Sequence, residues 1–210
     1  MKIGIIGSGN VGGTLGTRWA KNGHDVVFST RGPVNEELKS LLAKAGDTAR
    51  SAPVEETARA AEVILLATPA NAAEDALRSA ANLSGKVLID ATNPLLPDLS
   101  GLTVANSDSQ AERVARWASG ARVVKSFNTV GADIMANPTF SGGPVAMFYC
   151  GDDRQAKETV AGLIGELGFE ALDAGPLSQA RVLEPFAMLW ISLAVKYGYG
   201  RDIAFRLLRR

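Results

Sequence analysis

A glycine-rich hexapeptide near the start of the chain, Gly7-Ser8-Gly9-Asn10-Val11-Gly12, constrains the fold more than any other feature. It directly follows the apolar run Ile3–Ile6, which predicts a buried strand, and it opens a helical pattern from about Val11 to Asn22. In such a turn the first glycine permits a tight bend, the second lets backbone approach a pyrophosphate, and the third lets the helix pack closely on the strand. The free N–H groups of the helix start then face the phosphates. The motif predicts a dinucleotide site, and the alternative is a glycine-rich turn without a ligand.

The rest of the N-terminal part alternates short apolar runs with helical patterns. Runs of this kind without period-two alternation are typical of strands buried on both faces, and their alternation with helices indicates a parallel sheet with right-handed crossovers. We therefore predict an α/β, Rossmann-type, doubly wound fold with a mainly parallel sheet. The expected strands are Ile3–Ile6, Asp25–Phe28, Val63–Ala67, Lys86–Asp90 and Arg122–Ser126, and the expected helices are 11–22, 35–45, 70–81 and 110–118.

The pattern changes after about Gly143, so we predict a nucleotide-binding core over 1–143 and a sheet extension with a small C-terminal helical region over 144–210. Strands are expected at Val145–Cys150 and Glu170–Asp173, separated by a helix over Arg154–Leu167. The chain from Leu177 to Leu208 is expected to be rich in helix. Pro185 falls inside this stretch and should start or kink a helix there.

Composition excludes several classes of function. Lys and Arg (22) balance Asp and Glu (22), so the chain gives no sign of the basic surface that nucleic-acid binding requires. The single cysteine cannot form an internal disulfide, and no Cys or His spacing is typical of a metal site. No apolar stretch is long enough for a signal peptide or a membrane span. We expect a soluble cytoplasmic protein without a metal, a nucleic-acid partner or a membrane partner.

The end of the second predicted strand indicates which dinucleotide is bound. An NAD site usually places Asp or Glu there to hold the ribose hydroxyls, whereas this chain has Ser29, Thr30 and Arg31. Two hydroxyl groups and a guanidinium can hold a 2′-phosphate by charge-assisted hydrogen bonds. NADP is therefore favoured, and the alternative is a solvated arginine in a turn.

Polar residues also follow the later strands, at the edge of the sheet where ligands of such folds collect. Ala67, Thr68 and Pro69 end one strand, and Pro69 could form a rigid wall beside the ribose or nicotinamide or could simply start the next helix. Asn93 and Asn128 follow two further strands. They could orient a carboxamide or a substrate, but Asn residues also stabilise turns.

These motifs together resemble the NADPH:coenzyme F420 oxidoreductase family, whose members exchange a hydride between NADP(H) and a deazaflavin. The resemblance covers nearly the whole chain, and its most specific part is Leu172-Asp173-Ala174-Gly175-Pro176-Leu177-Ser178, continuing through Arg181 and Glu184. The oxidoreductase domain of the Steap metalloreductases, which uses NADPH to reduce flavin, is similar over its N-terminal portion.

The resemblance implies that Ser8, Gly9, Asn10 and Val11 contact the pyrophosphate and that Thr30 and Arg31 contact the 2′-phosphate. It also implies that Ala132 lies near the nicotinamide, with Thr68 and Pro69 lining the crevice. The family often continues with further basic residues after the arginine, whereas this chain has Gly32-Pro33-Val34-Asn35, so Arg31 is left as the main positive charge.

The sequence offers no obvious acid–base pair, and we assign no catalytic residue. The only histidine, His24, falls in a turn at the wrong end of the sheet, and Cys150 lies in an apolar strand. Lys196 is not followed four residues later by the asparagine of the β-hydroxyacid dehydrogenases. Hydride transfer to a flavin ring mainly requires alignment of donor and acceptor, because the acceptor nitrogen can take its proton from water.

We therefore expect an NADP-dependent oxidoreductase that uses a flavin or a deazaflavin such as coenzyme F420. The alternatives are a non-enzymatic NADP(H)-binding sensor and, more remotely, an imine or ketone reductase, which would require a proton donor. The large apolar residues of the C-terminal part favour a homodimer. The arginines of the last ten residues are expected at a solvated helix end, or in contact with an anionic part of the acceptor.

Overall fold

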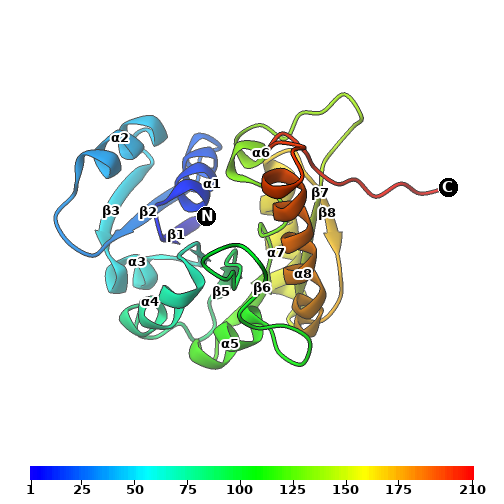
Figure 1. Ribbon diagram of the computed structural model, residues 1–210. Coiled ribbons are helices and arrows are strands. Elements are labelled where there is room, and N and C mark those ends of the chain that lie inside the picture. The colour runs from blue at the N-terminus through cyan, green and yellow to red at the C-terminus, as the bar shows by residue number, and fades with distance from the viewer.

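The computed structural model describes all 210 residues and shows a single eight-stranded sheet covered by helices on both faces (Figure 1). The strand order is β3-β2-β1-β4-β5-β6-β7-β8, and every neighbouring pair is parallel except β6 and β7. The strands are β1 (Lys2–Ile6), β2 (Asp25–Thr30), β3 (Ala49–Pro53), β4 (Val63–Leu66), β5 (Val87–Asp90), β6 (Arg122–Lys125), β7 (Ala146–Gly151) and β8 (Glu170–Asp173). The predicted doubly wound α/β fold is confirmed.

The helices form two layers. One buried cluster joins the sheet to α1, α2, α6 and α7, and a second cluster joins the opposite face to α3, α4, α5 and α8. The bounds are α1 (Asn10–Lys21), α2 (Glu36–Ala45), α3 (Val54–Ala60), α4 (Ala73–Ser79), α5 (Gln110–Trp117), α6 (Ala132–Ala136), α7 (Arg154–Glu166) and α8 (Ala180–Ile191). Two short 3-10 helices, η1 (Ala70–Ala72) and η2 (Leu177–Gln179), and a π-helical turn, η3 (Ser192–Lys196), complete the set. None of these helices combines the length and apolar character needed to cross a membrane.

Side chains at the helix starts explain where several helices begin. Asn35, Ser109 and Asp153 each accept a hydrogen bond from a backbone N–H of the first turn of α2, α5 and α7, respectively. Such caps satisfy N–H groups that have no partner within the helix. By contrast, Gly9 precedes α1 without any side-chain cap, so the first N–H groups of α1 stay free for another acceptor.

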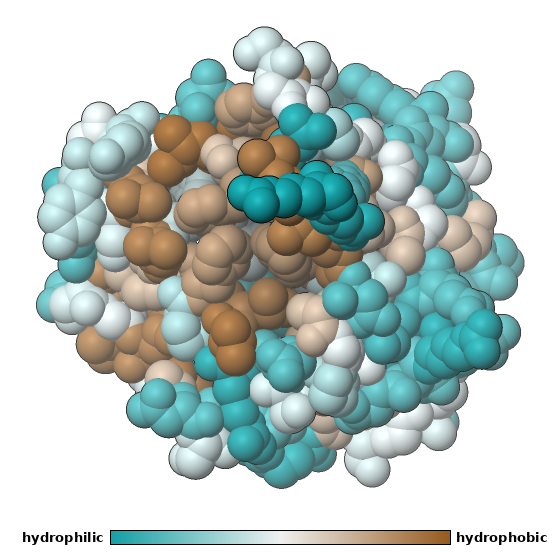
Figure 2. Space-filling model, turned by 90° about the vertical axis from the view of Figure 1, so that its right-hand side faces the viewer, coloured by the Kyte–Doolittle hydropathy of each residue, from teal (hydrophilic) through white to brown (hydrophobic).

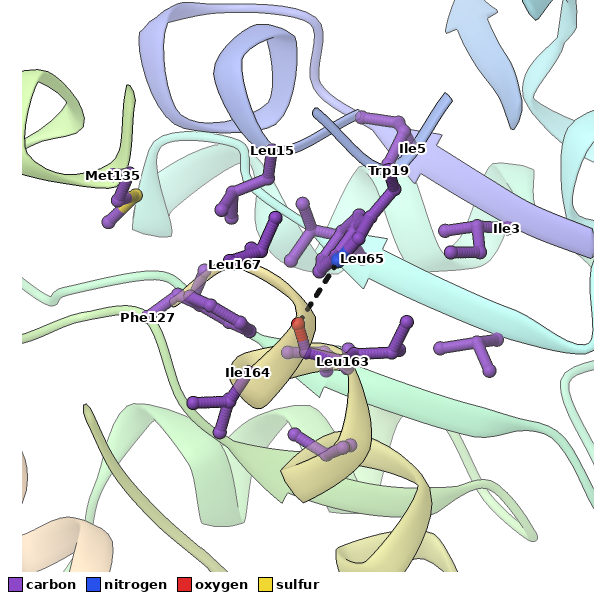
Figure 3. Packing of buried hydrophobic residues seen from close by; sticks show 14 of the residues in the cluster. Ile3, Ile5, Leu15, Trp19, Leu65, Phe127, Met135, Leu163, Ile164 and Leu167 are labelled. Atoms are coloured by element: carbon purple, nitrogen blue, oxygen red, sulfur yellow. Dashed lines mark hydrogen bonds between the residues drawn. The ribbon is translucent and has the colours of Figure 1, made fainter. Parts of the chain in front are cut away.

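Trp19 of α1 is the centre of the larger core cluster, as Figure 3 shows. Its indole N–H donates to the carbonyl of Leu163 in α7 at 3.3 Å, and its ring meets that of Phe127 edge-to-face, with centroids 5.7 Å apart. Aromatic pairs of this geometry contribute beyond the area that they bury. Helix α7 lies after residue 143, so this core contains residues from both sides of the predicted domain boundary. The boundary itself stays a prediction.

The C-terminal region departs from the helical prediction. Helical structure ends at Lys196, and residues 197–210 are not helical, whereas the sequence pattern extended to Leu208. Gly198 (φ 76°) and Gly200 (φ 75°) adopt the left-handed conformation that ends a helix. The terminal arginines therefore do not lie at a helix end, and Pro185 lies inside α8 rather than at its start.

Three elements were not assigned from the sequence, and each carries a weak local pattern. β3 is a polar strand at the edge of the sheet, α3 has only seven residues, and α6 has only five. The strands and helices expected from the sequence within residues 1–173 are otherwise present, with bounds that differ by a few residues.

Several large apolar side chains of the C-terminal region are exposed, notably Val182, Leu189, Val195 and Tyr197. Figure 2 shows this side of the molecule, on which hydrophobic residues form a broad patch. The predicted homodimer is not tested by this observation and stays a prediction.

Candidate active site

The turn between β1 and α1 has the geometry that a glycine-rich phosphate loop requires. Gly7 has a φ of 102°, and a Cβ atom on Gly12 would lie 1.9 Å from the carbonyl oxygen of Gly7. A Cβ atom on Gly9 would meet nothing within 4 Å, so the space above it is open. Gly12 thus permits close packing of α1, while Gly9 and the uncapped helix start leave room and free N–H groups for a pyrophosphate.

The end of β2 lies across a cavity of about 430 Å³ from η1 and α4. Arg31 is exposed and makes no ion pair or hydrogen bond within the protein, whereas the Thr30 hydroxyl donates to the carbonyl of Gly32 at 2.7 Å. Ser29 is almost buried at the end of the strand. An unpaired guanidinium beside two hydroxyl groups fits a 2′-phosphate.

This cavity brings together part of the predicted cofactor set, namely Gly7, Ser8, Ser29, Thr30, Arg31 and Thr68. Gly9 and Asn10 line the neighbouring groove between α1 and α2. Neither hollow is lined by Val11, Gly12, Ala67, Pro69, Asn93 or Ala132. The contacts predicted for all of these residues stay proposals, because the geometry shows where they lie and not what they bind.

The residues that follow β4 leave one buried hydroxyl without a partner. Thr68 Oγ1 is buried and has no hydrogen-bond partner within the protein, which is consistent with a group that meets a ligand. Pro69 immediately precedes η1, as expected if it starts the next helix. The backbone N–H of Ala67 donates to Ile6 at 2.8 Å and extends the pairing of β4 with β1.

The ends of β5 and β6 are joined by an amide pair. Asn93 donates to the backbone carbonyl of Asn128 at 2.9 Å, and Asn128 Nδ2 donates to Asn93 Oδ1 at 3.2 Å and to the Leu183 carbonyl at 3.2 Å. These bonds link two loops and α8, so both asparagines stabilise the local structure. Oδ1 of Asn128 is buried without a partner.

Beneath this amide pair lies a buried cluster of charges that the sequence analysis missed. Lys125 and Asp90 end neighbouring strands, and Lys125 Nζ lies 2.9 Å from Asp90 Oδ2 and 3.0 Å from Glu184 Oε1. All three side chains are essentially unexposed. A signal was available, because a charged residue directly follows the apolar residues Val87–Ile89 of β5 and Val123–Val124 of β6, but nothing local pointed to Glu184 as their partner.

The carboxylates hold Lys125 in its charged form. Burial alone lowers the pKa of this ammonium, but the negative charges of Asp90 and Glu184 outweigh burial and place the pKa above its ordinary value. Burial raises the pKa of Glu184, against the effect of Lys125. Each ion therefore depends on its neighbours to remain charged away from water.

The segment that we expect near the nicotinamide is contacted by residues of the C-terminal region. Ala132 begins α6, and the preceding Gly131 packs so tightly on Trp190 that a Cβ atom would lie 2.8 Å from the indole ring. Asp133 forms an ion pair with Arg201 at 2.9 Å. The segment after β6 is thus enclosed by α8 and the C-terminal tail.

The remaining candidate groups lie away from this edge or are inert. His24 pairs with Glu166 at 2.6 Å in the turn between α1 and β2, at the opposite edge of the sheet. Burial raises the pKa of the Cys150 thiol to about 12, so the thiolate does not form at neutral pH. No group of three or more His, Cys, Asp or Glu residues is arranged to hold a metal ion.

Comparison with known proteins places this geometry in a family. The sequence profile of the family described as "NADP oxidoreductase coenzyme F420-dependent" matches residues 2–94. The F420-dependent NADP reductase of Methanothermobacter marburgensis is 35% identical over 212 residues, which cover 93% of each protein. The chain belongs to the coenzyme F420-dependent NADP oxidoreductase family. It is therefore an NADP-dependent oxidoreductase.

Other members and relatives of this oxidoreductase family agree with the assignment. The crystal structure of a putative F420-dependent NADP reductase from Arthrobacter sp. FB24 is 32% identical, with a TM-score of 0.90 over the full length of both chains. The rat metalloreductase STEAP3 is 32% identical over 184 residues, which cover 87% of this chain but 36% of that protein. The chain thus spans about a third of the length of this relative.

Proposed function

We propose that this oxidoreductase transfers a hydride between NADP(H) and a planar flavin or deazaflavin acceptor of the coenzyme F420 type. The observation that carries the proposal is the state of the buried ionisable side chains at the ends of β5 and β6, which are bound to one another and to Glu184. Lys125 directs its N–H groups to Asp90, Glu184 and the Thr92 carbonyl. It therefore has no proton to share with a bound substrate, as reduction of a carbonyl or imine would require.

Binding of the dinucleotide would rest chiefly on groups without partners within the protein, whereas the Thr30 hydroxyl already donates to the Gly32 carbonyl. The free N–H groups of α1 and the open space at Gly9 fit the pyrophosphate, and Arg31 with Ser29 and Thr30 fits the 2′-phosphate. The hydroxyl of Thr68 is a further candidate for the ribose side. When bound, NADP(H) supplies the reacting nicotinamide ring.

The protein's own contribution would be alignment. The segment Ser126–Ala132 faces the proposed nicotinamide position from a buried, hydrogen-bonded frame, and this frame would hold the ring and exclude water from it. Alignment of two rings is the main requirement of hydride transfer between them. Relatives named F420-dependent NADP reductases support a deazaflavin as the acceptor.

The test is oxidation of NADPH by purified protein, followed by nicotinamide absorbance, with coenzyme F420, FMN, FAD or riboflavin as acceptor. We expect turnover with one acceptor class and about 10- to 100-fold weaker use of NADPH in Arg31→Ala, because a charge-assisted hydrogen bond contributes about 1.5–3 kcal/mol. NADH is the matched control, because it lacks the 2′-phosphate and its use should not depend on Arg31.

Two results would count against the proposal. Tight NADPH binding without reduction of any acceptor would favour the alternative of an NADP(H)-binding sensor. An equal effect of Arg31→Ala on the use of NADPH and NADH would show that Arg31 does not bind the 2′-phosphate. The identity of the acceptor would still be tested by the same assay.

A further inference from the structure

Lys125 is a fully buried cation whose position is fixed by three acceptors. Its ammonium donates to Asp90 Oδ2 at 2.9 Å and to the Thr92 carbonyl, and it lies 3.0 Å from Glu184 Oε1. An ammonium has three N–H groups, so each has one acceptor. The Asp90 carboxylate also accepts from the Thr92 backbone N–H at 2.9 Å and from its hydroxyl at 2.6 Å. Lys125 therefore ties the end of β6 to the residues that follow β5.

Glu184 extends this cluster to two helices. It belongs to α8, and its carboxylate accepts from the backbone N–H groups of Gln110 at 2.9 Å and Ala111 at 3.1 Å, in the first turn of α5. The positive end of α5 thus offsets the second carboxylate of the cluster. Every charge in the cluster has a partner, and the partners come from β5, β6, α5 and α8.

Helix α8 and the C-terminal tail also contact the chain segment after Lys125 at three positions. The Leu183 carbonyl accepts from Asn128, the Trp190 ring packs on Gly131, and Arg201 pairs with Asp133. Within the same segment Phe127 adopts a left-handed backbone conformation, with a φ of 58°, and its buried ring packs against Trp19. A bulky residue in this conformation persists only where the surroundings fix it.

We propose that Lys125, Asp90 and Glu184 are positioning residues for hydride transfer, because they fix the segment 126–132 beside the nicotinamide through α8. The inference rests on the proposed function and adds to it the residues that align the nicotinamide ring for hydride transfer. The cluster contacts neither the phosphate loop nor Arg31, so its removal should alter the nicotinamide end of the site and leave the adenosine end intact.

Stability alone is a weak reason for such a cluster. Buried ion pairs can often be replaced by uncharged residues of similar volume with little loss of stability, whereas removal of one partner is strongly destabilising. A neutral version of the cluster therefore separates folding from positioning. The triple variant Asp90→Asn/Lys125→Met/Glu184→Gln keeps the approximate shapes of the three side chains and an amide oxygen for one of the two backbone N–H groups of α5.

The experiment compares this triple variant with the native protein by three measurements. They are the dissociation constant of 2′,5′-ADP, which lacks the nicotinamide, the dissociation constant of NADPH, and the single-turnover rate of NADPH oxidation by an accepted flavin or deazaflavin. We expect unchanged 2′,5′-ADP affinity within about twofold and NADPH affinity weaker by several-fold. The transfer rate should be about 10- to 100-fold lower, since small misplacements have effects of that size.

A primary isotope effect with NADPH deuterated at the transferred position should increase in the variant, because hydride transfer becomes the slow step. A loss of general stability would not produce this change. Lys157→Met is the matched control: Lys157 also forms an ion pair, at 2.9 Å with Asp173 at the end of the outermost strand β8, and it has no hydrogen bond or ion pair with the three residues of the cluster. This variant should keep all of the native values.

The single variant Glu184→Gln makes the inference testable if the triple variant does not fold, since it removes one charge and keeps one of the two acceptors for the backbone N–H groups of α5. It should likewise weaken the binding of NADPH and leave the binding of 2′,5′-ADP unchanged. The loss of transfer rate should be smaller, about 3- to 10-fold. Native transfer rates and native NADPH affinity in a folded variant would overturn the inference. If the native protein reduces no acceptor, the proposed function fails, and the ratio of NADPH to 2′,5′-ADP affinity still tests the positioning role.

Discussion

The two ends of the crevice are built in different ways. At the end where we propose that the adenosine part binds, the backbone of one turn and a few side chains line the cavity, and Arg31 there has no partner within the protein. At the proposed nicotinamide end, the loops after β5 and β6 are bound to each other and to α8 by buried amides and charges. The first end depends mainly on the backbone of one short turn and is open to its ligand. The second end is held together by hydrogen bonds and ion pairs between residues that are far apart in sequence.

The largest expected effect breaks this frame. Lys125→Met leaves Asp90 and Glu184 buried together without a cation, and we expect it to lower the free energy of unfolding by about 3–5 kcal/mol. Urea denaturation followed by circular dichroism measures this loss. Arg154→Met, which removes an exposed ion pair with Glu158, should cost less than about 1 kcal/mol. Equal losses in the two variants would show that burial of the cluster is unimportant.

The next effect separates packing from binding within the phosphate loop. Gly12→Ala places a methyl group against the Gly7 carbonyl, and we expect a loss of about 3 kcal/mol or more of stability by thermal or urea unfolding. Gly9→Ala has open space for its methyl group, so its stability should change by less than about 0.5 kcal/mol. Gly9→Ala should instead weaken NADPH binding, measured by fluorescence titration. A stable Gly12→Ala protein would contradict the tight packing of α1.

A smaller effect tests the contact between α8 and α6. Gly131→Ala directs a methyl group to within 2.8 Å of the Trp190 ring, so we expect a loss of about 1–3 kcal/mol. In a Trp190→Leu background the same substitution should cost little, because the ring is gone. The four unfolding free energies form a double-mutant cycle, and additive values would show that the two residues are not coupled.

The smallest effect concerns an exposed charge cluster. Hydrogen bonds from Arg116 lower the pKa of Asp108 from 3.8 to about 2, so this carboxylate stabilises the folded protein above its unfolded pKa. That contribution is lost as the pH falls from about 4 to about 2, and solvent screening should keep it below about 1 kcal/mol. The unfolding free energy of Asp108→Asn should accordingly fall less steeply over this range. An equally steep fall would remove Asp108 from the acid response.

What the sequence predicted follows the same division. Gly7, Gly9 and Gly12 are neighbours in sequence, and their spacing has meaning without knowledge of the rest of the fold. Lys125 and Asp90 are 35 residues apart, and Glu184 binds the start of α5 across 74 residues, so no local pattern reports that they meet. The sequence indicated that Asn93 and Asn128 either orient a ligand or stabilise turns, but no local pattern reports that their amides bind each other.

The C-terminal tail shows a different limit. Its arginines, leucines and aromatic residues are compatible with a helix, but Gly198 and Gly200 end the helical region, and the tail instead makes tertiary contacts. Trp190 Nε1 donates to the Ile203 carbonyl at 2.7 Å, and the Ala146 N–H donates to the Phe205 carbonyl at 3.0 Å. Partners of this kind, from other elements, override a weak local preference.

The reversal of one strand determines where the end of the chain can act. Because β7 runs antiparallel to β6, and β8 is parallel to β7, both strands run in the direction away from the carboxyl ends of β1–β6, and α8 runs back in the opposite direction. With a parallel β7, α8 would begin at the crevice and carry the last residues to the far edge. The single antiparallel pairing thus brings the late part of the chain to the side of the sheet where we propose that the acceptor binds. On the proposed function, sequence changes in the final twenty residues would alter the choice of acceptor, while the dinucleotide end, formed by residues of the first eighty, stays the same.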